Sequence, residues 1–407
     1  MPLSLPLGDG TVPVELPESD VTVAEPQGAE PVDVRAATKR ALDTPLGPPL
    51  SVRVSGDEAV TVVVTDVTRA TPDDVLLEAL LDRLASAGVA RDQVTVVIGL
   101  GLHRPMGDDE IRSALGENAD LAVNHDPDAA VTVGRVDDVP VLVHPAVARA
   151  DLVLSTGMVE PHQYAGFSGG AKTVVVGAGG EPLIRHTHGP EMLSRPGVRL
   201  GRVEDNPFRE TIDRAGEPAG PDVCLNVTHG PSGILGVAAG NPRAVVDRLA
   251  GVARDALAVE VANGYDAVVA GVGAPKDANL YQATRAATYV ALGAHNPLQD
   301  GGRIVVPAAL PEGAGDGTGE QRFSEWLSGA SDAGSLYEEM RTGYEAGAQR
   351  AFVVARVLRN HDVWITNSDH PEIVEDCLMD HADAVEAAVD PGSEVLVVPD
   401  ALNTLLV

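Results

Sequence analysis

The sequence predicts an α/β protein of two domains, each with a mainly parallel sheet flanked by helices. Short runs of β-branched residues alternate with glycine-rich or polar turns and then with helical segments, which is typical of parallel sheets. The chain has 407 residues, more than a typical single domain. Its hydrophobic content of 44% is that of a globular protein with a substantial core.

The elements follow from these runs in chain order. Residues 1 to about 50 hold many prolines and predict an irregular or β-rich lead-in. Runs of β-branched and apolar residues predict strands at Val60–Val64, Val94–Ile98, Asp151–Leu154, Thr173–Val176, Val223–Val227, Asp266–Gly273, Arg303–Val306 and Glu394–Val398. Helical periodicity predicts helices at residues 73–88 and 241–260.

The domain boundary is expected near Asn263–Gly264, after the long helix. This gives a catalytic and cofactor-binding domain of residues 1–262 and a carboxyl-terminal α/β domain of residues 263–407. The glycine-rich segment Gly313–Glu320 is expected to be a flexible loop within the second half.

Charge and composition narrow the class of partner. The net charge of −31 argues against nucleic acid and anionic membranes as partners, because both require positive surface. Arginine supplies nearly all the positive charge, since the only lysines are Lys39, Lys172 and Lys276. Such acidity with so little lysine is typical of salt-adapted proteins, although a high-GC genome would also replace lysine by arginine.

No secretion signal and no apolar run of about 20 residues is evident, so we expect a cytoplasmic protein without a membrane span. The two cysteines, Cys224 and Cys377, form no CxxC or zinc pattern. We expect them to be buried thiols in a reducing compartment.

Four polar clusters each follow a predicted strand: TDVTRATP, GLGLHRP, STGMVEPHQY and GVGAPKDANLYQ. Ligands of open α/β sheets bind at the carboxyl ends of the strands. The sequence therefore predicts a ligand site built from these clusters.

In the first cluster, Thr71 to Asp74 are explained by a helix start, but Asp66, Thr68 and Arg69 are not. Arg69 can bind a carboxylate or phosphate as a bidentate donor, and the alternative is a salt bridge with Asp66. In the second cluster, glycines bring His103 onto the sheet edge. A lone loop histidine is more often a surface residue than a catalytic one.

The stretch Glu160–Lys172, EPHQYAGFSGGAK, combines an acid, His162, a glycine turn and a rare lysine. The turn of Ser168, Gly169 and Gly170 can cradle a phosphate, or it is a tight structural turn. Its spacing is neither that of a P-loop nor that of a dinucleotide-binding loop. Lys172 can lose a proton and form covalent bonds, which arginine in practice cannot.

His186 and His188 lie two residues apart. They would diverge on a helix but could line one cleft in an extended segment, where imidazole is a common ligand of nickel and zinc. We expect the remaining histidines to be structural. From the residues alone, we expect a two-domain α/β enzyme that binds an anionic ligand at the strand ends. A bound metal is a further alternative.

These clusters, in this order, resemble the lactate racemase family that uses a nickel-pincer nucleotide. The resemblance spans most of the chain in five blocks: DxTRxTP at Asp66–Pro72, GxHRP at Gly101–Pro105, EPHxxAGFSGGxK at Glu160–Lys172, the block of His188, and PxDxNxYQA at Pro275–Ala283.

The resemblance implies a cofactor, a pyridinium-3,5-bisthiocarboxylic-type mononucleotide that binds Ni(II) through two sulfurs and a carbon. His188 would complete the roughly square-planar nickel site, and Lys172 would be joined to the cofactor through its thioacyl group. Asp66, Thr68 and the turn Ser168–Gly170 would hold the cofactor. Cofactor-biosynthesis proteins are the implied partners.

The resemblance also implies the chemistry. One of the histidines His103 and His162 removes the hydroxyl proton of a small 2-hydroxy acid while the α-hydrogen leaves as hydride to the cofactor. The other histidine serves the opposite enantiomer. Arg69 would hold the substrate carboxylate, and Tyr281 and Gln282 would line the pocket from the second domain. The active site is then expected between the domains.

The chain departs from the family pattern at several positions. Arg285 stands where lactate-specific members carry a lysine, and a guanidinium there could bind a second carboxylate. Ala171 replaces a frequent arginine, and Val176 a frequent proline. The pocket tryptophan of the family has no clear counterpart, and Gln349 falls in that region.

Three functions follow as alternatives. The first is a racemase or epimerase of lactate or a related 2-hydroxy acid. The second keeps the cofactor and chemistry but acts on malate, another dicarboxylate or an aldonate, with Arg285 as the discriminating residue. The third is a non-catalytic nucleotide- or nickel-binding protein, against which the presence of both His103 and His162 argues.

Overall fold

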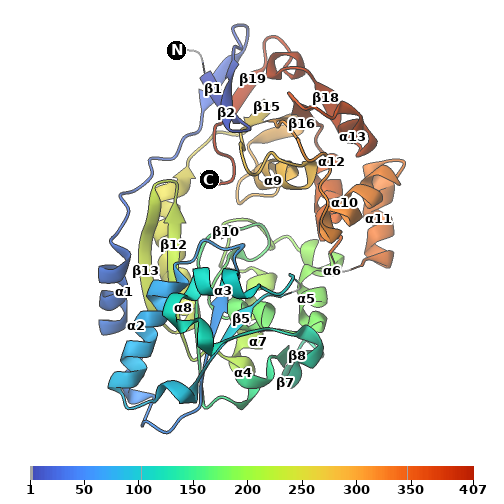
Figure 1. Ribbon diagram of the computed structural model, residues 1–407. Helices are drawn as coiled ribbons and strands as arrows, with labels where there is room; N and C mark the ends of the chain where they lie inside the picture. The colour runs from blue at the N-terminus through green and yellow to red at the C-terminus, as the bar shows by residue number, and fades with distance from the viewer. Residues whose placement is uncertain (1–2, 102, 346) are drawn as a thin grey trace. The chain divides into compact units, whose positions relative to one another are not determined.

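The computed structural model describes residues 3–101, 103–345 and 347–407 and divides into two compact units (Figure 1). Unit 1 consists of Met1–Gln27, His188–Gly201 and Leu257–Val407, and unit 2 of Gly28–Thr187 and Arg202–Ala256. The sequence-based division lay between residues 262 and 263. In the structure, the first 27 residues and the segment 188–201 group with the carboxyl-terminal part of the chain.

Unit 2 is built on a six-stranded sheet with the order β13-β12-β9-β4-β5-β6. All neighbouring strands are parallel except the antiparallel pair β12–β13. The strands are β4 (Val60–Thr65), β5 (Val94–Gly99), β6 (Ala122–Asn124), β9 (Leu152–Met158), β12 (Val223–Gly230) and β13 (Gly233–Gly240). Every residue of β9 is buried, as expected for a central parallel strand covered on both faces.

Helices and two hairpins complete unit 2. The helices are α1 (Val34–Asp43), α2 (Asp73–Ser86), α3 (Asp108–Leu115), α4 (Pro145–Arg149), α5 (Glu181–His188), α7 (Pro207–Ala219) and α8 (Pro242–Leu257). The hairpins are β7 (Val131–Val136) with β8 (Val139–Val143), and β10 (Pro161–His162) with β11 (Gly166–Phe167). Helix α1 lies in the proline-rich lead-in and was not predicted, although Asp33 caps it by accepting from the N–H of Ala36.

The prediction of a strand at Thr173–Val176 is wrong. Residues Thr173–Gly177 form a π-helical turn, in which the N–H of Ala178 donates to the carbonyl of Thr173, five residues earlier, at 3.3 Å. The strand β9 already has β4 and β12 as its two neighbours, so no pairing position is open beside it. The valines instead pack into the interior, where Val174 and Val175 are fully buried.

Unit 1 is built on a second six-stranded sheet, with the order β18-β17-β16-β15-β19-β3 and all neighbours parallel. Its strands are β3 (Asp20–Val23), β15 (Tyr265–Ala270), β16 (Leu298–Pro307), β17 (Val363–Thr366), β18 (Asp380–Ala382) and β19 (Glu394–Val398). The edge strand β3 comes from the amino-terminal segment, which explains why residues 1–27 group with this unit.

The helices of unit 1 are α6 (Pro190–Leu193), α9 (Leu280–Ala291), α10 (Thr318–Ser328), α11 (Ala333–Gly343), α12 (Gln349–Leu358) and α13 (Pro371–Asp376). Two small strand pairs are β1 (Leu3–Leu7) with β2 (Gly10–Val14), and β14 (Ala258–Val259) with β20 (Leu405–Leu406). The loop expected at Gly313–Glu320 ends where α10 begins at Thr318.

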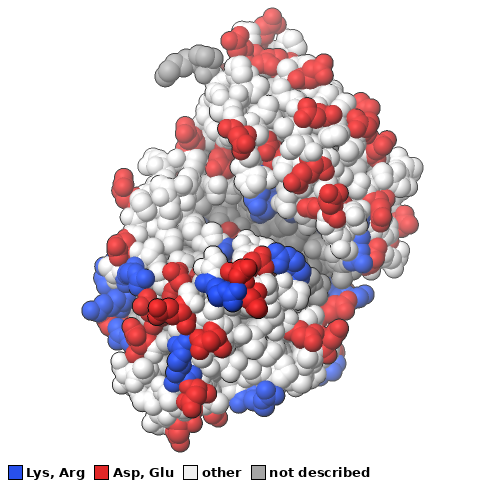
Figure 2. Space-filling model, viewed as in Figure 1, with Lys and Arg blue, Asp and Glu red and all other residues white. Residues whose placement is uncertain are grey.

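Three compositional predictions bear on the surface and interior. Cys224 and Cys377 are buried free thiols, as expected. Among the described residues, no helix is both long enough and apolar enough to cross a membrane. Acidic side chains are spread over the face of the molecule in Figure 2, with fewer basic ones between them. Adaptation to salt stays a prediction.

A buried carboxyl group at the start of α2 predicts a pH-dependent stability. Asp73 is 4% exposed and accepts from the hydroxyls of Thr65 at 2.7 Å and Thr156 at 2.5 Å. Burial raises the pKa of Asp73 to about 6, and these two hydrogen bonds oppose that rise. Because the folded-state pKa lies above the unfolded one, the stabilising contribution of Asp73 is present below about pH 4 and is lost as the pH rises through about 6.

We therefore expect the free energy of unfolding of the wild type, relative to that of Asp73→Asn, to fall by roughly 3 kcal/mol between pH 4 and pH 7. Urea unfolding at a series of pH values measures this difference. The matched control is Asp74→Asn, which removes a charge from the same helix end but from an exposed side chain. An identical pH dependence in the wild type and Asp73→Asn would contradict the prediction.

The hairpin β10–β11 packs directly on neighbouring main chain and predicts a second stability effect. A Cβ atom added at Gly166, whose φ is +74°, would lie 1.8 Å from the carbonyl oxygen of Arg202. We expect Gly166→Ala to lower the free energy of unfolding by about 3 kcal/mol or more. Gly251→Ala in α8 is the control, because its added Cβ meets nothing within 4 Å and alanine favours the helix. Equal thermal midpoints of the two variants would show that the approach at Gly166 is not tight.

Candidate functional site

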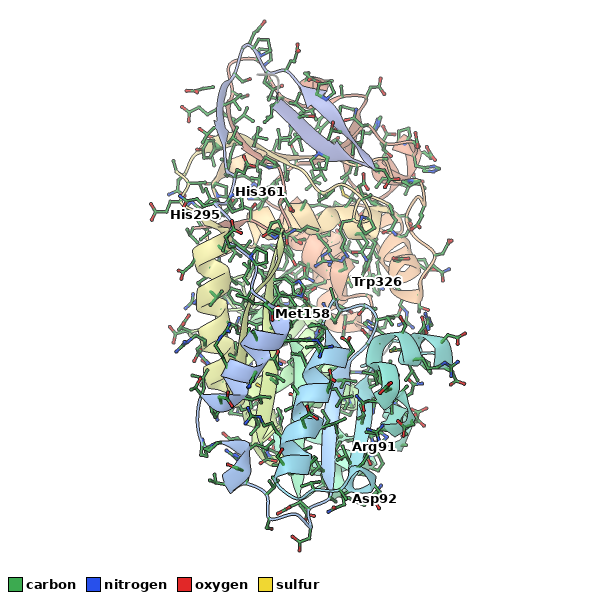
Figure 3. All side chains as sticks on the ribbon, turned by 60° about the vertical axis from the view of Figure 1, so that its left-hand side comes forward. Arg91, Asp92, Met158, His295, Trp326 and His361 are labelled. Carbon is green, nitrogen blue, oxygen red and sulfur yellow. The ribbon has the colours of Figure 1, made fainter. Side chains whose placement is uncertain are left out.

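Three of the four polar clusters lie at the carboxyl edge of the unit 2 sheet. Figure 3 shows Arg91 and Asp92, just before β5, at one end of the unit and Met158, the last residue of β9, toward the other. Because β4, β5 and β9 run parallel, the loops that follow them share the edge marked by Met158. These loops carry Asp66, His103 and His162. The fourth cluster follows β15 and belongs to unit 1.

A carboxylate orients the first predicted histidine. Asp66 is 6% exposed; its Oδ2 lies 2.6 Å from Nδ1 of His103, and its Oδ1 accepts from the backbone N–H and hydroxyl of Thr68 at 3.0 and 2.5 Å. Burial acts to raise the pKa of Asp66, but the hydrogen bonds from His103 and Thr68 outweigh it and hold that pKa below its usual value. Asp66 is therefore a carboxylate, so Nδ1 of His103 carries a proton and the lone pair of the neutral ring is on Nε2.

Backbone amides orient the second predicted histidine in the opposite sense. Nδ1 of His162 accepts from the N–H groups of Tyr164 and Ala165, both at 3.2 Å. The ring also packs edge-on against Tyr164, with the centroids 5.6 Å apart. Since Nδ1 is an acceptor, the neutral ring of His162 carries its proton on Nε2.

Arg69 pairs with Glu160 rather than with the side chain of Asp66. Its Nη1 donates to Oε1 of Glu160 at 2.7 Å, and both side chains are about one-third exposed. Its backbone N–H donates to the carbonyl of Asp66 at 3.1 Å. A partly exposed pair of this kind contributes little stability, so Arg69 can exchange its partner for another carboxylate at small cost.

The glycine turn is held by hydrogen bonds within the protein. The hydroxyl of Ser168 donates to the carbonyl of Met158 at 2.7 Å and accepts from the N–H of Glu160 at 3.0 Å. The N–H of Gly170 donates to Oδ1 of Asn226 at 2.9 Å. Gly169 and Gly170 have positive φ and no room for a Cβ. Contact of Ser168, Gly169, Gly170 and Thr68 with a cofactor stays a prediction.

Lys172 has an unusually acidic ammonium group. Burial, followed by the positive charges of Arg69 and Arg209, lowers the pKa of Lys172 to about 7, while Glu160 opposes the shift. The residue retains partial solvent exposure. Near neutral pH, a large fraction of its amine is therefore unprotonated and can act as a nucleophile.

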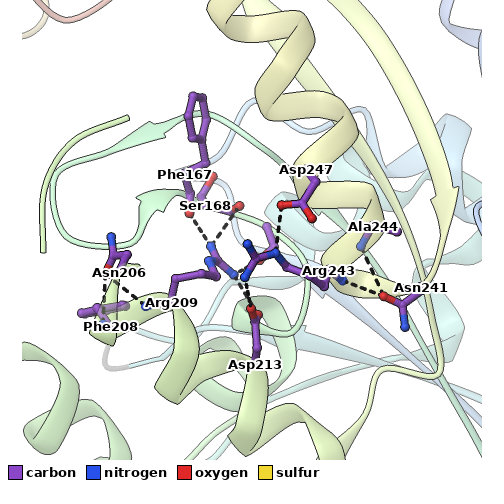
Figure 4. A network of polar contacts seen from close by, with 12 residues as sticks. Phe167, Ser168, Asn206, Phe208, Arg209, Asp213, Asn241, Arg243, Ala244 and Asp247 are labelled. Carbon is purple, nitrogen blue, oxygen red and sulfur yellow. Dashed lines mark hydrogen bonds and ion pairs between the residues drawn. The ribbon is translucent and has the colours of Figure 1, made fainter. Parts of the chain in front are cut away.

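The start of α7 contributes two residues that the sequence did not single out. Asn206 caps the helix and donates to the carbonyls of Tyr164 at 2.8 Å and Arg202 at 2.9 Å. Arg209, fully buried, reaches the carbonyls of Phe167 to Gly169 (Figure 4). An Asn-Pro pair before an amphipathic stretch marks the helix start, but no pattern shows that Arg209 points inward.

Several polar atoms at this edge fit a bound polar molecule. Thr71 Oγ1, Gln163 Oε1 and His229 Nε2 are buried and lack a hydrogen-bond partner within the described part of the chain. They lie in the loops after β4 and β9 and near the end of β12, where a ligand could satisfy them. No group of three or more His, Cys, Asp and Glu among the described residues is placed to hold a metal ion by itself.

His186 and His188 do not form a pair. Both lie on α5, where a two-residue spacing turns side chains to different faces. His186 is 3.7 Å from a carboxylate oxygen of Asp137 in unit 2, whereas His188 begins a segment of unit 1. The role of His188 as a nickel ligand stays a prediction.

The predicted substrate residues of the second domain lie on α9 of unit 1. The guanidinium of Arg350 lies 4.8 Å from the centre of the Tyr281 ring. Arg285, one turn further along the helix, donates to the hydroxyl of Tyr289 at 3.0 Å. Gln282 lies between them in the first turn of α9.

Both parts of this chain are similar in sequence to domains of known proteins. Residues 7–201 match the lactate racemase N-terminal domain and residues 260–405 the lactate racemase C-terminal domain. The lactate racemase of Thermoanaerobacterium thermosaccharolyticum is 27% identical, with 99% of each chain covered. The lactate racemase of Lactiplantibacillus plantarum is 27% identical, with 90% of each covered.

Solved structures share the fold. The lactate racemase apoprotein of T. thermosaccharolyticum superimposes with a TM-score of 0.87 at 24% identity, covering 100% of both chains. A Thermotoga maritima protein gives a TM-score of 0.65 at 18% identity, covering 92% of this chain and 98% of its own. The two domain matches cover most of the sequence, so the chain belongs to the lactate racemase family and is an isomerase.

Proposed function

We propose that this enzyme racemises a 2-hydroxy acid, with lactate the first candidate, and that His103 and His162 are its acid–base pair. The observation that carries the proposal is the contrast between their Nδ1 partners, a carboxylate for His103 and two backbone N–H groups for His162. Lactate is the first candidate because both relatives named above are lactate racemases.

From this contrast, the proton of the neutral ring is on Nδ1 in His103 and on Nε2 in His162. Nε2 of His103 can accept the hydroxyl proton of the substrate, and the buried carboxylate of Asp66 stabilises the imidazolium that results. Nε2 of His162 offers a proton to the substrate oxygen. In one direction of the reaction, a two-base racemase requires one ring to accept a proton and the other to donate one. The opposite direction requires the two rings to exchange these roles.

Arg69 is the candidate for binding the substrate carboxylate. Its guanidinium is partly exposed at the same edge and is held by only one side-chain partner, Glu160, in the contacts described above. An incoming carboxylate can form a bidentate pair with the fork.

The α-hydrogen of a 2-hydroxy acid is not acidic, so the proton transfers alone do not complete the reaction. When bound, a nickel-pincer nucleotide would supply the acceptor for this hydrogen as hydride. Lys172 would hold it through its amine, and His188 would ligate its nickel. The lowered pKa of Lys172 and the buried polar atoms of Thr71, Gln163 and His229 support a cofactor at this edge.

Arg285 keeps a dicarboxylate as an alternative substrate. The half-buried guanidinium of Arg285, one helical turn after Tyr281, would favour a second carboxylate over the methyl group of lactate. Racemisation of lactate, malate and an aldonate by one enzyme preparation separates these substrates.

The test of the proposed function is expression with the cofactor-building enzymes, followed by nickel analysis and assays with enantiopure 2-hydroxy acids. We expect one nickel per chain and racemisation of at least one acid. His103→Asn and His162→Asn should each lower kcat by about 10²-fold or more with nickel retained. Full turnover in either variant would overturn the assignment, and loaded enzyme without turnover on any acid would favour the binding-protein alternative.

Asp66→Asn tests the tautomer of His103. The N–H of Thr68 points at Oδ1, so the amide oxygen should take that position and the amide NH₂ should face Nδ1 of His103. His103 would then hold its proton on Nε2 and lose its function as a base. We expect kcat to fall by about 10²- to 10⁴-fold.

Nickel content distinguishes this role of Asp66 from cofactor binding. Retained nickel with low kcat supports a role through His103. Loss of nickel in proportion to activity would instead place Asp66 among the cofactor-binding residues.

A further inference from the structure

Unit 1 contains a buried guanidinium group without a carboxylate partner. Arg350 lies in the first turn of α12 and is 5% exposed. Its Nε and Nη1 are enclosed and make no hydrogen bond, and no Asp or Glu in the described part of the chain forms an ion pair with it. The buried Arg209 of unit 2, by contrast, lies 3.5 Å from the carboxylate of Asp213 and donates to three carbonyls.

The position of Arg350 in its helix is also unfavourable for a positive charge. Residues 350–355 of α12 are all buried, so the guanidinium has little water around it. The first turn is the positive end of a helix, where a cation is destabilising. A charge that is retained at a cost to stability is typical of a residue that serves function rather than the fold.

An aromatic ring lies against this guanidinium. Its Cζ is 4.8 Å from the ring centre of Tyr281 on α9, a helix that packs against α12 (Figure 1). A cation over an aromatic face is attracted to it, but this attraction offsets only part of the cost of burial. Tyr281 is only half-buried, so a ligand can reach it, and the next residue, Gln282, has a buried Oε1 without a hydrogen-bond partner among the described residues.

Arg285, one turn after Tyr281, differs from Arg350 in its contacts. Its Nη2 donates to the hydroxyl of Tyr289 at 3.0 Å, and its guanidinium lies 5.6 Å from the centre of that ring. Arg285 therefore has a hydrogen-bond partner on its own helix, whereas Nε and Nη1 of Arg350 have none in the described chain. Arg350 is the stronger candidate for binding an anion.

We infer that Arg350 binds a carboxylate of the substrate and that Tyr281 forms the wall of this subsite. Arg69 in unit 2 is the candidate for the carboxylate beside the reacting carbon, so Arg350 takes a second one. The preferred substrate is then a 2-hydroxy dicarboxylate, the class to which malate belongs. The inference rests on the proposed function for the reaction, but the subsite itself requires neither cofactor nor turnover.

Binding of succinate to the full-length apoprotein tests the subsite without any reaction. Succinate has two carboxylates and no hydroxyl group, so it cannot be racemised. The net charge of −31 repels anions in general, so saturable binding requires a local site. By isothermal titration calorimetry, we expect succinate to bind about 10-fold more tightly or better than butyrate, which has the same chain length and one carboxylate.

In Arg350→Met, we expect the Kd for succinate to rise by about 10-fold or more. Arg359→Met is the matched control, because Arg359 also lies over a tyrosine ring, that of Tyr337 at 4.3 Å, but is exposed. The absence of saturable binding to the wild type would overturn the subsite. So would equal Kd values for the wild type and Arg350→Met, or an equal loss in Arg359→Met.

Thermal unfolding without ligand separates a binding role from a structural one. Arg350→Met removes a buried charge and keeps most of the apolar volume, so its thermal midpoint should equal or exceed that of the wild type. A lower midpoint with an unchanged Kd would assign Arg350 to the fold instead. Arg350→Lys carries the binding test if Arg350→Met is too unstable to titrate. It keeps the charge but not the planar fork, so a wild-type Kd in this variant would overturn the role of the guanidinium.

The cofactor-loaded enzyme tests the substrate class. We expect kcat/KM of the wild type for malate to exceed that for lactate by about 10-fold or more, and Arg350→Met to lower only the value for malate. A higher value for lactate would overturn the dicarboxylate assignment, and equal losses for both acids would overturn the role in specificity.

The two experiments also separate the subsite from the reaction. Succinate binding without racemisation of any acid would leave the subsite and remove the proposed reaction. Racemisation of lactate without succinate binding would do the reverse.

Discussion

The candidate site depends on how closely the segment between Glu160 and Lys172 packs against neighbouring main chain. Gly166 lies where any side chain would meet the carbonyl of Arg202, and Gly169 and Gly170 adopt backbone conformations that only glycine adopts without strain. This packing brings the carbonyls of the turn onto Arg209 and fixes the backbone that leads to Lys172. The position of Lys172 and the need for glycine before it therefore follow from the same close packing.

The proposed acid–base chemistry depends on equally local interactions. A single strand-end loop supplies both the carboxylate of Asp66 and the N–H of Thr68 that orients it, while the hairpin of His162 supplies its own amides. The two imidazoles therefore receive opposite tautomers from elements only a few residues long. Either ring can be altered without rearranging the sheet beneath it, which is why folds of this kind can vary their chemistry through their loops.

The sequence predicted most strands of both sheets, because parallel strands buried on two faces leave continuous β-branched runs such as Val60–Val64. It also placed Asp66, His103 and His162 on one edge. It failed at Thr173–Val176, where the same kind of run is buried as a π-helical turn, since strand propensity does not report whether a pairing position is open. It could not find Arg209, because arginine in an amphipathic helix usually faces solvent and only tertiary structure reveals the carbonyls that it binds.

The residues whose roles come from the family resemblance lie apart from this sheet edge in the chain's division into units. Family membership and the fold are shown by the matched domains and the superimposed structures, which depend on the whole chain. His188, which we propose as the nickel ligand, and the proposed pocket residues Tyr281, Gln282 and Arg285 belong to unit 1. The sheet edge described above belongs to unit 2, so its geometry does not determine what these residues do.

The pairing of β3 with β19 has a consequence for synthesis on the ribosome. Residues 20–23 emerge early, yet their partner is residues 394–398, and the chain passes between the two units four times before it ends. Unit 2 has all its strands once residue 240 has been made, whereas unit 1 cannot close its sheet edge until translation is nearly complete. Folding should therefore proceed in two stages, because unit 2 can complete its sheet well before β3 meets its partner β19.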